Sequence, residues 1–194
     1  MKKYVLIALT ACALNAGAQG SYPIEAKAFR DAYVETHEVV KGEDRKQLHF
    51  FPINAAYRVQ ARFEKVEDGP WIEFKTSTPM KQIYRVYGRA SFRIHDTLVQ
   101  LNIYQSQMLM GVDGYKDYLF LPFTDLTTGV ESYETGRYID LKLGEITDGK
   151  VTIDFNRCYN PYCAYRAGYA CPIPPKENAL PVAIPAGEMK YGKH

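Results

Sequence analysis

Hydrophobic and polar side chains alternate along one short segment after another between residues 56 and 155. The first clear segment places hydrophobic side chains at every second position: Tyr57, Val59, Ala61 and Phe63. A period of two puts these side chains on one face of an extended chain, which is typical of a strand buried on one side only. The alternation therefore predicts a mainly β domain, and it constrains the fold more than any other feature.

Similar alternation, or a short apolar run, predicts further strands at 71–76, 83–94, 99–103, 118–123, 138–143 and 151–155. Gly88 interrupts the longest of these segments, which is typical of a β-bulge. Asp148-Gly149 is a strong hairpin signal and predicts that residues 143–146 pair with residues 151–155. Strands that follow one another through short turns predict an antiparallel meander, which forms either a barrel or a sandwich.

The two ends of the chain differ from this central region. Residues 24–39 follow Pro23 and space their apolar residues as a helix does, so we expect an N-terminal helix across one opening of the sheet. From residue 156 onward the chain holds six of its eleven prolines, which predicts a long Pro-rich C-terminal loop that caps the domain. The expected organisation is a helix and linker at 19–47 and a single β domain at 48–194.

The first 18 residues have the features of a signal peptide. Lys2 and Lys3 precede an apolar run at 4–14, and Ala16-Gly17-Ala18 offers small residues for cleavage after Ala18. This pattern predicts export to the periplasm or beyond the cell. The alternative is a lipobox, because Leu9-Thr10-Ala11-Cys12 would place a lipid anchor on Cys12.

Net charge and residue spacing exclude several classes of partner. The chain has 24 basic and 22 acidic side chains, and removal of residues 1–18 leaves 22 of each. Nucleic-acid binding requires an excess of basic charge, so none is expected, and no apolar stretch beyond residue 18 is long enough for a membrane span. The cysteine spacing C-x4-C-x7-C and the isolated histidines indicate no metal site, and no motif indicates a cofactor.

Five longer motifs carry a family resemblance. They are LHFFPINAAYRVQARF (48–63), LFLPFTDLTTGVESYETGRYIDL (119–141), DFNRCYNPYCAY (154–165), CPIPPKEN (171–178) and AGE (186–188). Together they resemble the bacterial and archaeal domain-of-unknown-function family 1684 over residues 30–190. That family has no established activity, so the resemblance implies a shared domain and adds little chemistry.

The resemblance also implies which cysteines pair. Cys163 and Cys171 are the family-like pair, whereas Cys158 stands where the family usually has a small apolar residue and takes no family role. Export favours disulfide-bonded cysteines, and closing so short a loop is worth about 2–3 kcal/mol. Three free thiols are the alternative.

The same motifs contain the candidate ligand-binding residues. Acidic residues bracket Arg137, and tyrosines, which offer an apolar face and a polar tip, are frequent between 133 and 169. The candidates are Glu131, Tyr133, Arg137, Asn156, Tyr159, Asn160, Glu177 and Asn178. We expect Arg137, Tyr159, Asn160 and Glu177 to converge on one concavity that holds a small polar ligand. Alternatively, these side chains tie the C-terminal segment to the sheet and the tyrosines pack the sheet.

Two classes of function are consistent with these residues. The first is an exported module of the cell envelope, either structural or binding a small polar ligand. The alternative is a hydrolase that uses carboxylates and tyrosines of 125–140 and 154–178, since paired carboxyl groups perform general acid–base catalysis when one lies in a dry site. The sequence leaves open whether the protein is an enzyme.

Overall fold

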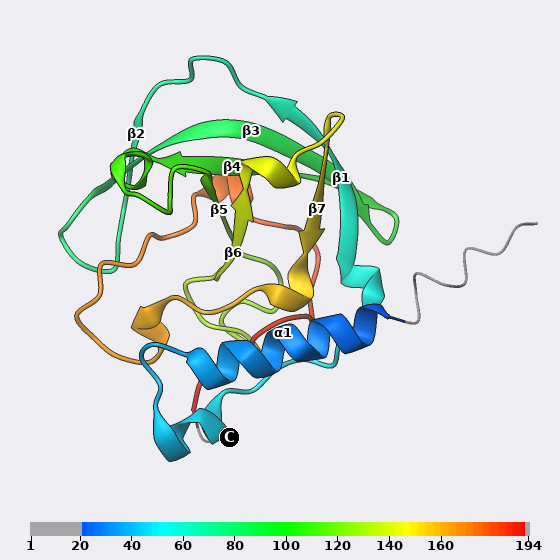
Figure 1. Cartoon of the computed structure of the whole chain (residues 1–194), viewed down its shortest axis with the longest axis vertical. Coiled ribbons are helices and arrows are strands. Elements are labelled where there is room, and N and C mark those ends of the chain that lie inside the picture. The colour runs from blue at the N-terminus through cyan, green and yellow to red at the C-terminus, as the bar shows by residue number, and fades with distance from the viewer. Residues whose placement is uncertain (1–20, 193–194) are drawn as a thin grey trace, which may run out of the picture.

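The computed structural model describes residues 21–192, and within them one seven-stranded antiparallel sheet forms the body of the protein (Figure 1). The order of the strands is β6-β5-β4-β3-β1-β7, and β2 pairs with β3 outside this path. The strands are β1 (Arg58–Lys65), β2 (Ile72–Phe74), β3 (Gln82–Ile94), β4 (Thr97–Ser106), β5 (Tyr118–Phe123), β6 (Arg137–Lys142) and β7 (Lys150–Asp154).

The sheet curls into a half-barrel, so the open choice between barrel and sandwich is settled by a single curved sheet whose end strands are β6 and β7. The predicted alternation is confirmed, because every second side chain points into the concave side. The buried residues there come from all parts of the sheet and include Ala61, Leu101, Leu119, Ile139 and Ile153. Burial of these apolar side chains is the main stabilisation of the sheet.

The bulge predicted at Gly88 is confirmed. The pairing of β3 with β4 shifts register between Val86 and Gly88. The ring of Phe63 on β1 covers this position so closely that a Cβ atom at residue 88 would lie 2.2 Å from Phe63 Cζ. Glycine is therefore required by close packing as well as by the bulge.

The predicted pairing of residues 143–146 with residues 151–155 across Asp148-Gly149 is wrong. The turn itself forms, with positive φ at both residues and a bridge between Thr147 and Lys150. However, residues 143–145 form a 3-10 turn, and β7 pairs with β1 instead of with β6. The curvature of the sheet brings β7 to the free edge of β1, where five residue pairs form, so a local turn signal is overridden by non-local pairing.

A second hydrophobic cluster lies on the convex face of the sheet. It contains only aromatic residues, with Tyr118 and Tyr159 packed at its margin: Phe74, Tyr84, Tyr104, Phe120 and Tyr138. These residues alternate with those of the concave side, so the central strands are buried on both faces. The segment after β7 covers part of this cluster, because the Tyr138 hydroxyl donates to the carbonyl of Pro172.

Helix α1 (Tyr22–Thr36) lies across one end of the half-barrel, close to the predicted position (Figure 1). Several side chains attach it to the domain, and two of them are tyrosines. The Tyr22 hydroxyl donates to Asp154 Oδ1 at 2.7 Å, and the Tyr33 hydroxyl donates to Glu188 Oε2 at 3.0 Å. No helix among residues 21–192 is long and apolar enough to cross a membrane.

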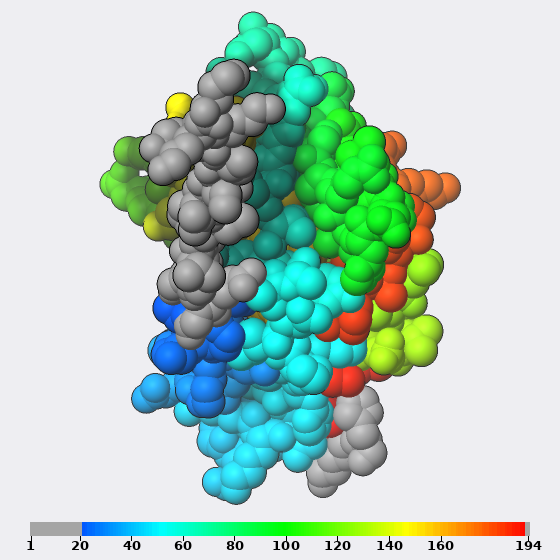
Figure 2. Space-filling model, turned by 90° about the vertical axis from the view of Figure 1, so that its right-hand side faces the viewer, coloured from blue at the N-terminus to red at the C-terminus, as the bar shows by residue number. Residues whose placement is uncertain are grey.

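The Pro-rich C-terminal segment is irregular, as expected, but part of it is buried. After β7 it passes around the sheet and returns toward α1, where red C-terminal residues reach the surface among the cyan ones that follow the helix (Figures 1 and 2). Leu180, Ile184 and Ala186 join the concave core. The segment therefore completes the core as well as covering the sheet.

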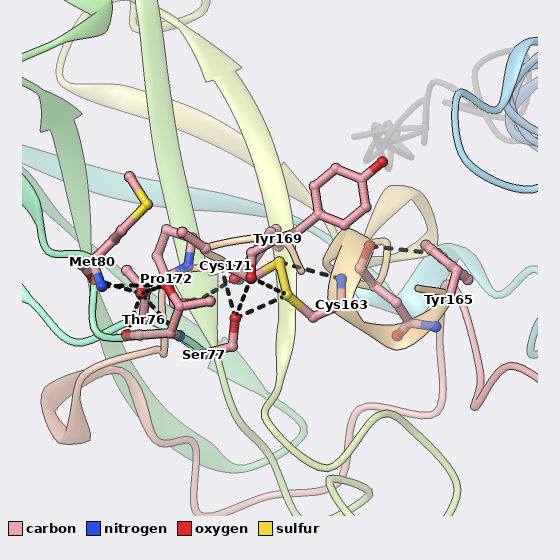
Figure 3. The surroundings of a disulfide bond; sticks show 12 residues. Thr76, Ser77, Met80, Cys163, Tyr165, Tyr169, Cys171 and Pro172 are labelled. Carbon is pink, nitrogen blue, oxygen red and sulfur yellow. Dashed lines mark hydrogen bonds between the residues drawn. A yellow bond between two sulfur atoms is a disulfide. The ribbon is translucent and has the colours of Figure 1, made fainter. Parts of the chain in front are cut away.

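The disulfide between Cys163 and Cys171 is present, which confirms the pair, and Cys158 is a buried free cysteine. Ser77, in the loop after β2, lies against the disulfide (Figure 3). The Cys171 amide donates to Ser77 Oγ at 3.0 Å, and Ser77 Oγ donates to the Tyr169 carbonyl at 2.7 Å. The disulfide thus closes the 163–171 loop, and Ser77 holds the closed loop against the segment after β2.

Candidate functional site at the open seam of the half-barrel

A cleft of about 780 Å³ lies where the half-barrel is open, between its two end strands, β6 and β7. We call it the seam cleft. Its lining includes Arg58, Tyr118, Asp140, Thr152, Arg157 and Tyr159. The α1 helix contributes Phe29 at one end, and the 3-10 turn after β6 contributes Glu145. A volume of this size is typical of a pocket for a small molecule.

Asp140 is the central polar group of the seam cleft. It lies on β6 at an outward-facing position, between the core residues Ile139 and Leu141. Two tyrosine hydroxyls donate to the same carboxylate oxygen, Oδ1: that of Tyr118 at 2.8 Å and that of Tyr159 at 2.6 Å. One carboxylate and two hydroxyl groups from three segments of the chain therefore meet in the cleft.

The surroundings of Asp140 shift its proton affinity. The residue is open to solvent on one side, but the walls of the cleft enclose it on the others, and this desolvation raises the pKa of the carboxyl group. The hydrogen bonds from Tyr159 and Tyr118 oppose that rise. Burial raises the pKa of both tyrosines well above the usual range, so both hydroxyls keep their protons near neutral pH.

The end of the cleft beside α1 is held by ion pairs. Arg157 pairs with Glu25 on the helix and, at 3.3 Å, with Asp154 on β7, and its guanidinium lies over the ring of Phe29. The guanidinium of Arg58 lies 5.0 Å from the ring centroid of Tyr22. These charged groups attach the helix to the sheet, whereas Asp140 makes no such attachment.

Arg137 does not line the seam cleft. Its side chain is fully buried and forms an ion pair with Asp125, whose Oδ2 lies 2.8 Å from Arg137 Nη2. The guanidinium also donates to the carbonyls of Ile184, Ala186 and Glu188. It therefore ties the C-terminal segment to the sheet, as the alternative reading expected, although through Asp125 and three carbonyl groups.

The predicted convergence of Arg137, Tyr159, Asn160 and Glu177 on one concavity is not found. Tyr159 lines the seam cleft and a smaller hollow beside α1, and neither includes the other three residues. Asn160 is buried and donates from Nδ2 to the Met189 carbonyl at 2.7 Å. Glu177 is exposed on a 3-10 turn. Buried residues that link segments of the chain are therefore of the same types as the residues of a binding site.

The remaining candidates also lie apart from the cleft. Asn156 is buried and binds the main chain of Asn54 through two hydrogen bonds. Asn178 is buried and links β4 to β5, because its amide donates to the carbonyls of Asn102 and Pro122. Glu131 is exposed and Tyr133 half-buried, and neither lines the seam cleft.

Two polar residues of the site were not among the candidates. The sequence predicts Tyr118 only as the first residue of the strand at 118–123, and Asp140 only as one of the carboxylates in 125–140. The useful signal is their position: Phe120 pairs with Asp140, so Tyr118, two residues away on the same face of β5, lies diagonally opposite the carboxylate. An outward-facing aspartate beside outward-facing aromatic residues of a neighbouring strand therefore indicates a candidate site.

A buried carboxyl group under α1 was also missed. Glu188 is fully buried and accepts hydrogen bonds from the Asn160 amide and from the hydroxyls of Tyr33 and Tyr165. Burial raises its pKa to about 7, against the effect of these donors and of Arg137. It lies in the AGE motif.

Within residues 21–192, no group of three or more His, Cys, Asp or Glu side chains is placed to hold a metal ion.

The fold and the cleft together define an antiparallel half-barrel protein with a small polar cleft at its seam. The family model described as "Protein of unknown function (DUF1684)" matches residues 43–189, more than half of the chain, and the protein belongs to this family. The resemblance expected from the five motifs is thereby confirmed.

A similar solved structure is the solution NMR structure of the uncharacterised protein from gene locus rrnAC0354 of Haloarcula marismortui. It has a TM-score of 0.67 and 30% sequence identity, and the match covers 89% of this chain and 96% of that one. A comparison with curated proteins gives no match.

Proposed function

We propose that this protein binds a small polar ligand in the seam cleft. The observation that carries the proposal is the meeting of Asp140, Tyr118 and Tyr159 at the cleft wall. A charged carboxylate that is partly desolvated and held only by two hydroxyl groups is costly to maintain in a purely structural role. Concave sites with a few convergent polar groups among apolar walls are typical of ligand binding.

The buried polar groups of the protein support this distinction. Arg137, Asp125 and Asn178 make hydrogen bonds that join separate segments, and these bonds give each of them a structural role. Asp140 joins β6 to Tyr118 on β5 and to Tyr159 on the segment after β7, but main-chain pairs at Tyr118–Lys142 and Tyr138–Tyr159 already hold both segments against β6. Its removal would therefore cost little stability, which makes a role in binding the more economical explanation.

A thermal-shift screen that includes a variant with a blocked cleft tests the proposal. Thr152 is exposed on β7 and lines the cleft, whereas Gln100 is exposed on β4 and does not. We expect a library of small polar compounds to contain at least one that raises the melting temperature of the wild type and of Gln100→Trp but not of Thr152→Trp. Compounds that stabilise all three proteins equally would place binding elsewhere and contradict the proposal.

A hydrolase is the second candidate, and the raised pKa of Asp140 favours it. A carboxyl group that keeps its proton to higher pH than usual is suited to general acid catalysis. Asp140 and Tyr159 also fall in the two segments, 125–140 and 154–178, from which such an enzyme would draw its groups. Chromogenic esters, phosphate esters and glycosides test this candidate, which requires turnover by the wild type and its loss in Asp140→Asn.

We also propose that the protein is exported and acts in the cell envelope. The Cys163–Cys171 disulfide supports export, because such bonds persist in oxidising compartments. The predicted signal peptide and the alternative anchor at Cys12 both lie outside the described residues. Mass spectrometry of the mature protein should find Gln19 as its first residue. A diacylglyceryl group on Cys12 would instead establish a lipid anchor.

A further inference from the structure

The hydrogen atoms at Asp140 determine what kind of ligand the seam cleft accepts. A tyrosine hydroxyl has a single hydrogen to donate. Tyr118 and Tyr159 both direct theirs to Oδ1 of Asp140, at 2.8 and 2.6 Å. Their remaining lone pairs, and the whole of Oδ2, are acceptors. Among the described residues, Oδ2 has no hydrogen-bond or ion-pair partner, and Asp140 is an exposed residue that lines the cleft.

The charges around this group point in the same direction. Five carboxylates and three basic side chains of the described residues line the cleft. Arg157 is engaged by Glu25 and Asp154, and no basic side chain of the described residues forms an ion pair with Asp140. The described part of the cleft therefore carries more negative than positive charge, and none of its basic side chains is ion-paired with Asp140.

Aromatic rings supply the remaining surface beside Asp140. Tyr115 is 49% exposed, and its ring centroid lies 6.0 Å from that of Tyr118 in an edge-on arrangement. Aromatic rings next to a carboxylate favour organic cations, which are attracted by the ring faces and paired by the carboxylate. Among the described residues, an anionic ligand would find no free hydroxyl hydrogen at Asp140, and the five carboxylates of the cleft outnumber its basic side chains, Arg58, Lys142 and Arg157.

We propose that the seam cleft binds a protonated primary amine, with its ammonium group on Asp140 Oδ2 and on the hydroxyl oxygens of Tyr118 and Tyr159. The three N–H donors of an ammonium group match these three acceptors. The apolar part of the ligand lies against the aromatic side of the cleft. This inference rests on the proposed function, because it requires the cleft to be a binding site and adds the chemical class of the ligand.

Two probes of the same shape and different charge test the inference. Benzylammonium carries the expected group, and benzyl alcohol is its neutral counterpart. Each is titrated into the ¹⁵N-labelled protein, with amide shifts of the cleft residues as the measure of binding. We expect benzylammonium to shift the amides of Tyr118, Asp140 and Tyr159 and to bind at least about tenfold more tightly than the alcohol, the size of one charge-assisted hydrogen bond.

Two variants separate charge from structure. Asp140→Asn keeps an oxygen that accepts the tyrosine hydrogen bonds but removes the charge, so benzylammonium binding should fall about tenfold or more. Asp96→Asn, at an exposed turn outside the cleft, makes the same chemical change and should bind as the wild type does. Equal binding of both probes at the cleft, unaffected by Asp140→Asn, would overturn the amine inference and leave the cleft as a site. Absence of shifts in the cleft with either probe would overturn both.

Discussion

Replacement of Arg137 by methionine should lower the stability of the folded protein more than the loss of any exposed charge does. The guanidinium is fully buried, pairs with Asp125 at 2.8 Å, and donates to three main-chain carbonyls of the C-terminal segment. Methionine has a similar length but no charge and no donor. Removal of one partner of a buried ion pair leaves the other charge without compensation and costs about 3–5 kcal/mol.

Urea denaturation followed by circular dichroism and by tyrosine fluorescence measures this cost. We expect Arg137→Met to lower the free energy of unfolding by at least about 3 kcal/mol. Arg137→Lys should lose less, because a single ammonium group keeps the charge near Asp125 but cannot reach all the carbonyl acceptors. The matched control is Arg89→Met on the exposed face of β3, with an expected change within about 0.5 kcal/mol.

A different result would assign Arg137 another role. If Arg137→Met unfolds within about 1 kcal/mol of the wild type, well below the loss expected for a buried pair, the fastening role is wrong. If that variant also loses ligand binding, Arg137 belongs to a binding site, which is what the sequence predicted.

Two further predictions concern the C-terminal segment. Replacing Cys163 and Cys171 together by serine should lower the free energy of unfolding by about 2–3 kcal/mol in urea titrations, because the disulfide closes their loop, and an unchanged midpoint would contradict this stabilisation. Glu188, with its pKa raised to about 7, keeps its proton in the folded state over a range where the unfolded chain has lost it. Stability should therefore fall as pH rises from about 4.5 to about 7, by about 3 kcal/mol relative to Glu188→Gln, and a pH-independent difference between the two proteins would refute this.

The pattern of side chains along the chain predicted most of the fold. Alternation or a short apolar run marked each strand, because these patterns reflect which faces are buried, and Gly88 marked the bulge where the Phe63 ring needs space. The pairing of β7 with β1 was not predictable in the same way. It joins residues about 90 positions apart through the curvature of the whole sheet, and a local turn at Asp148-Gly149 carries no information about that curvature.

The site was less predictable, because residue type alone does not distinguish residues that bind a ligand from residues that link segments of the chain. Arg137, Asn160 and Asn178 have the residue types of a polar pocket, but burial turns each of them into a link between segments. Tyr118 and Asp140 meet only because β5 and β6 pair in one particular register. That register depends on the packing of the whole sheet, so the pair becomes visible only in three dimensions.

The position of a bound ligand tests most directly whether the seam cleft is the functional site. A crystal of the wild-type protein soaked with the strongest compound from the cleft-blocking screen should show the compound between β6 and β7, in contact with Asp140 and at least one of Tyr118 and Tyr159. A second cleft lies on the outer side of β1 and is lined by Gln60–Glu64 and Asp148–Lys150. Density in that second cleft, with the seam cleft empty, would contradict the assignment.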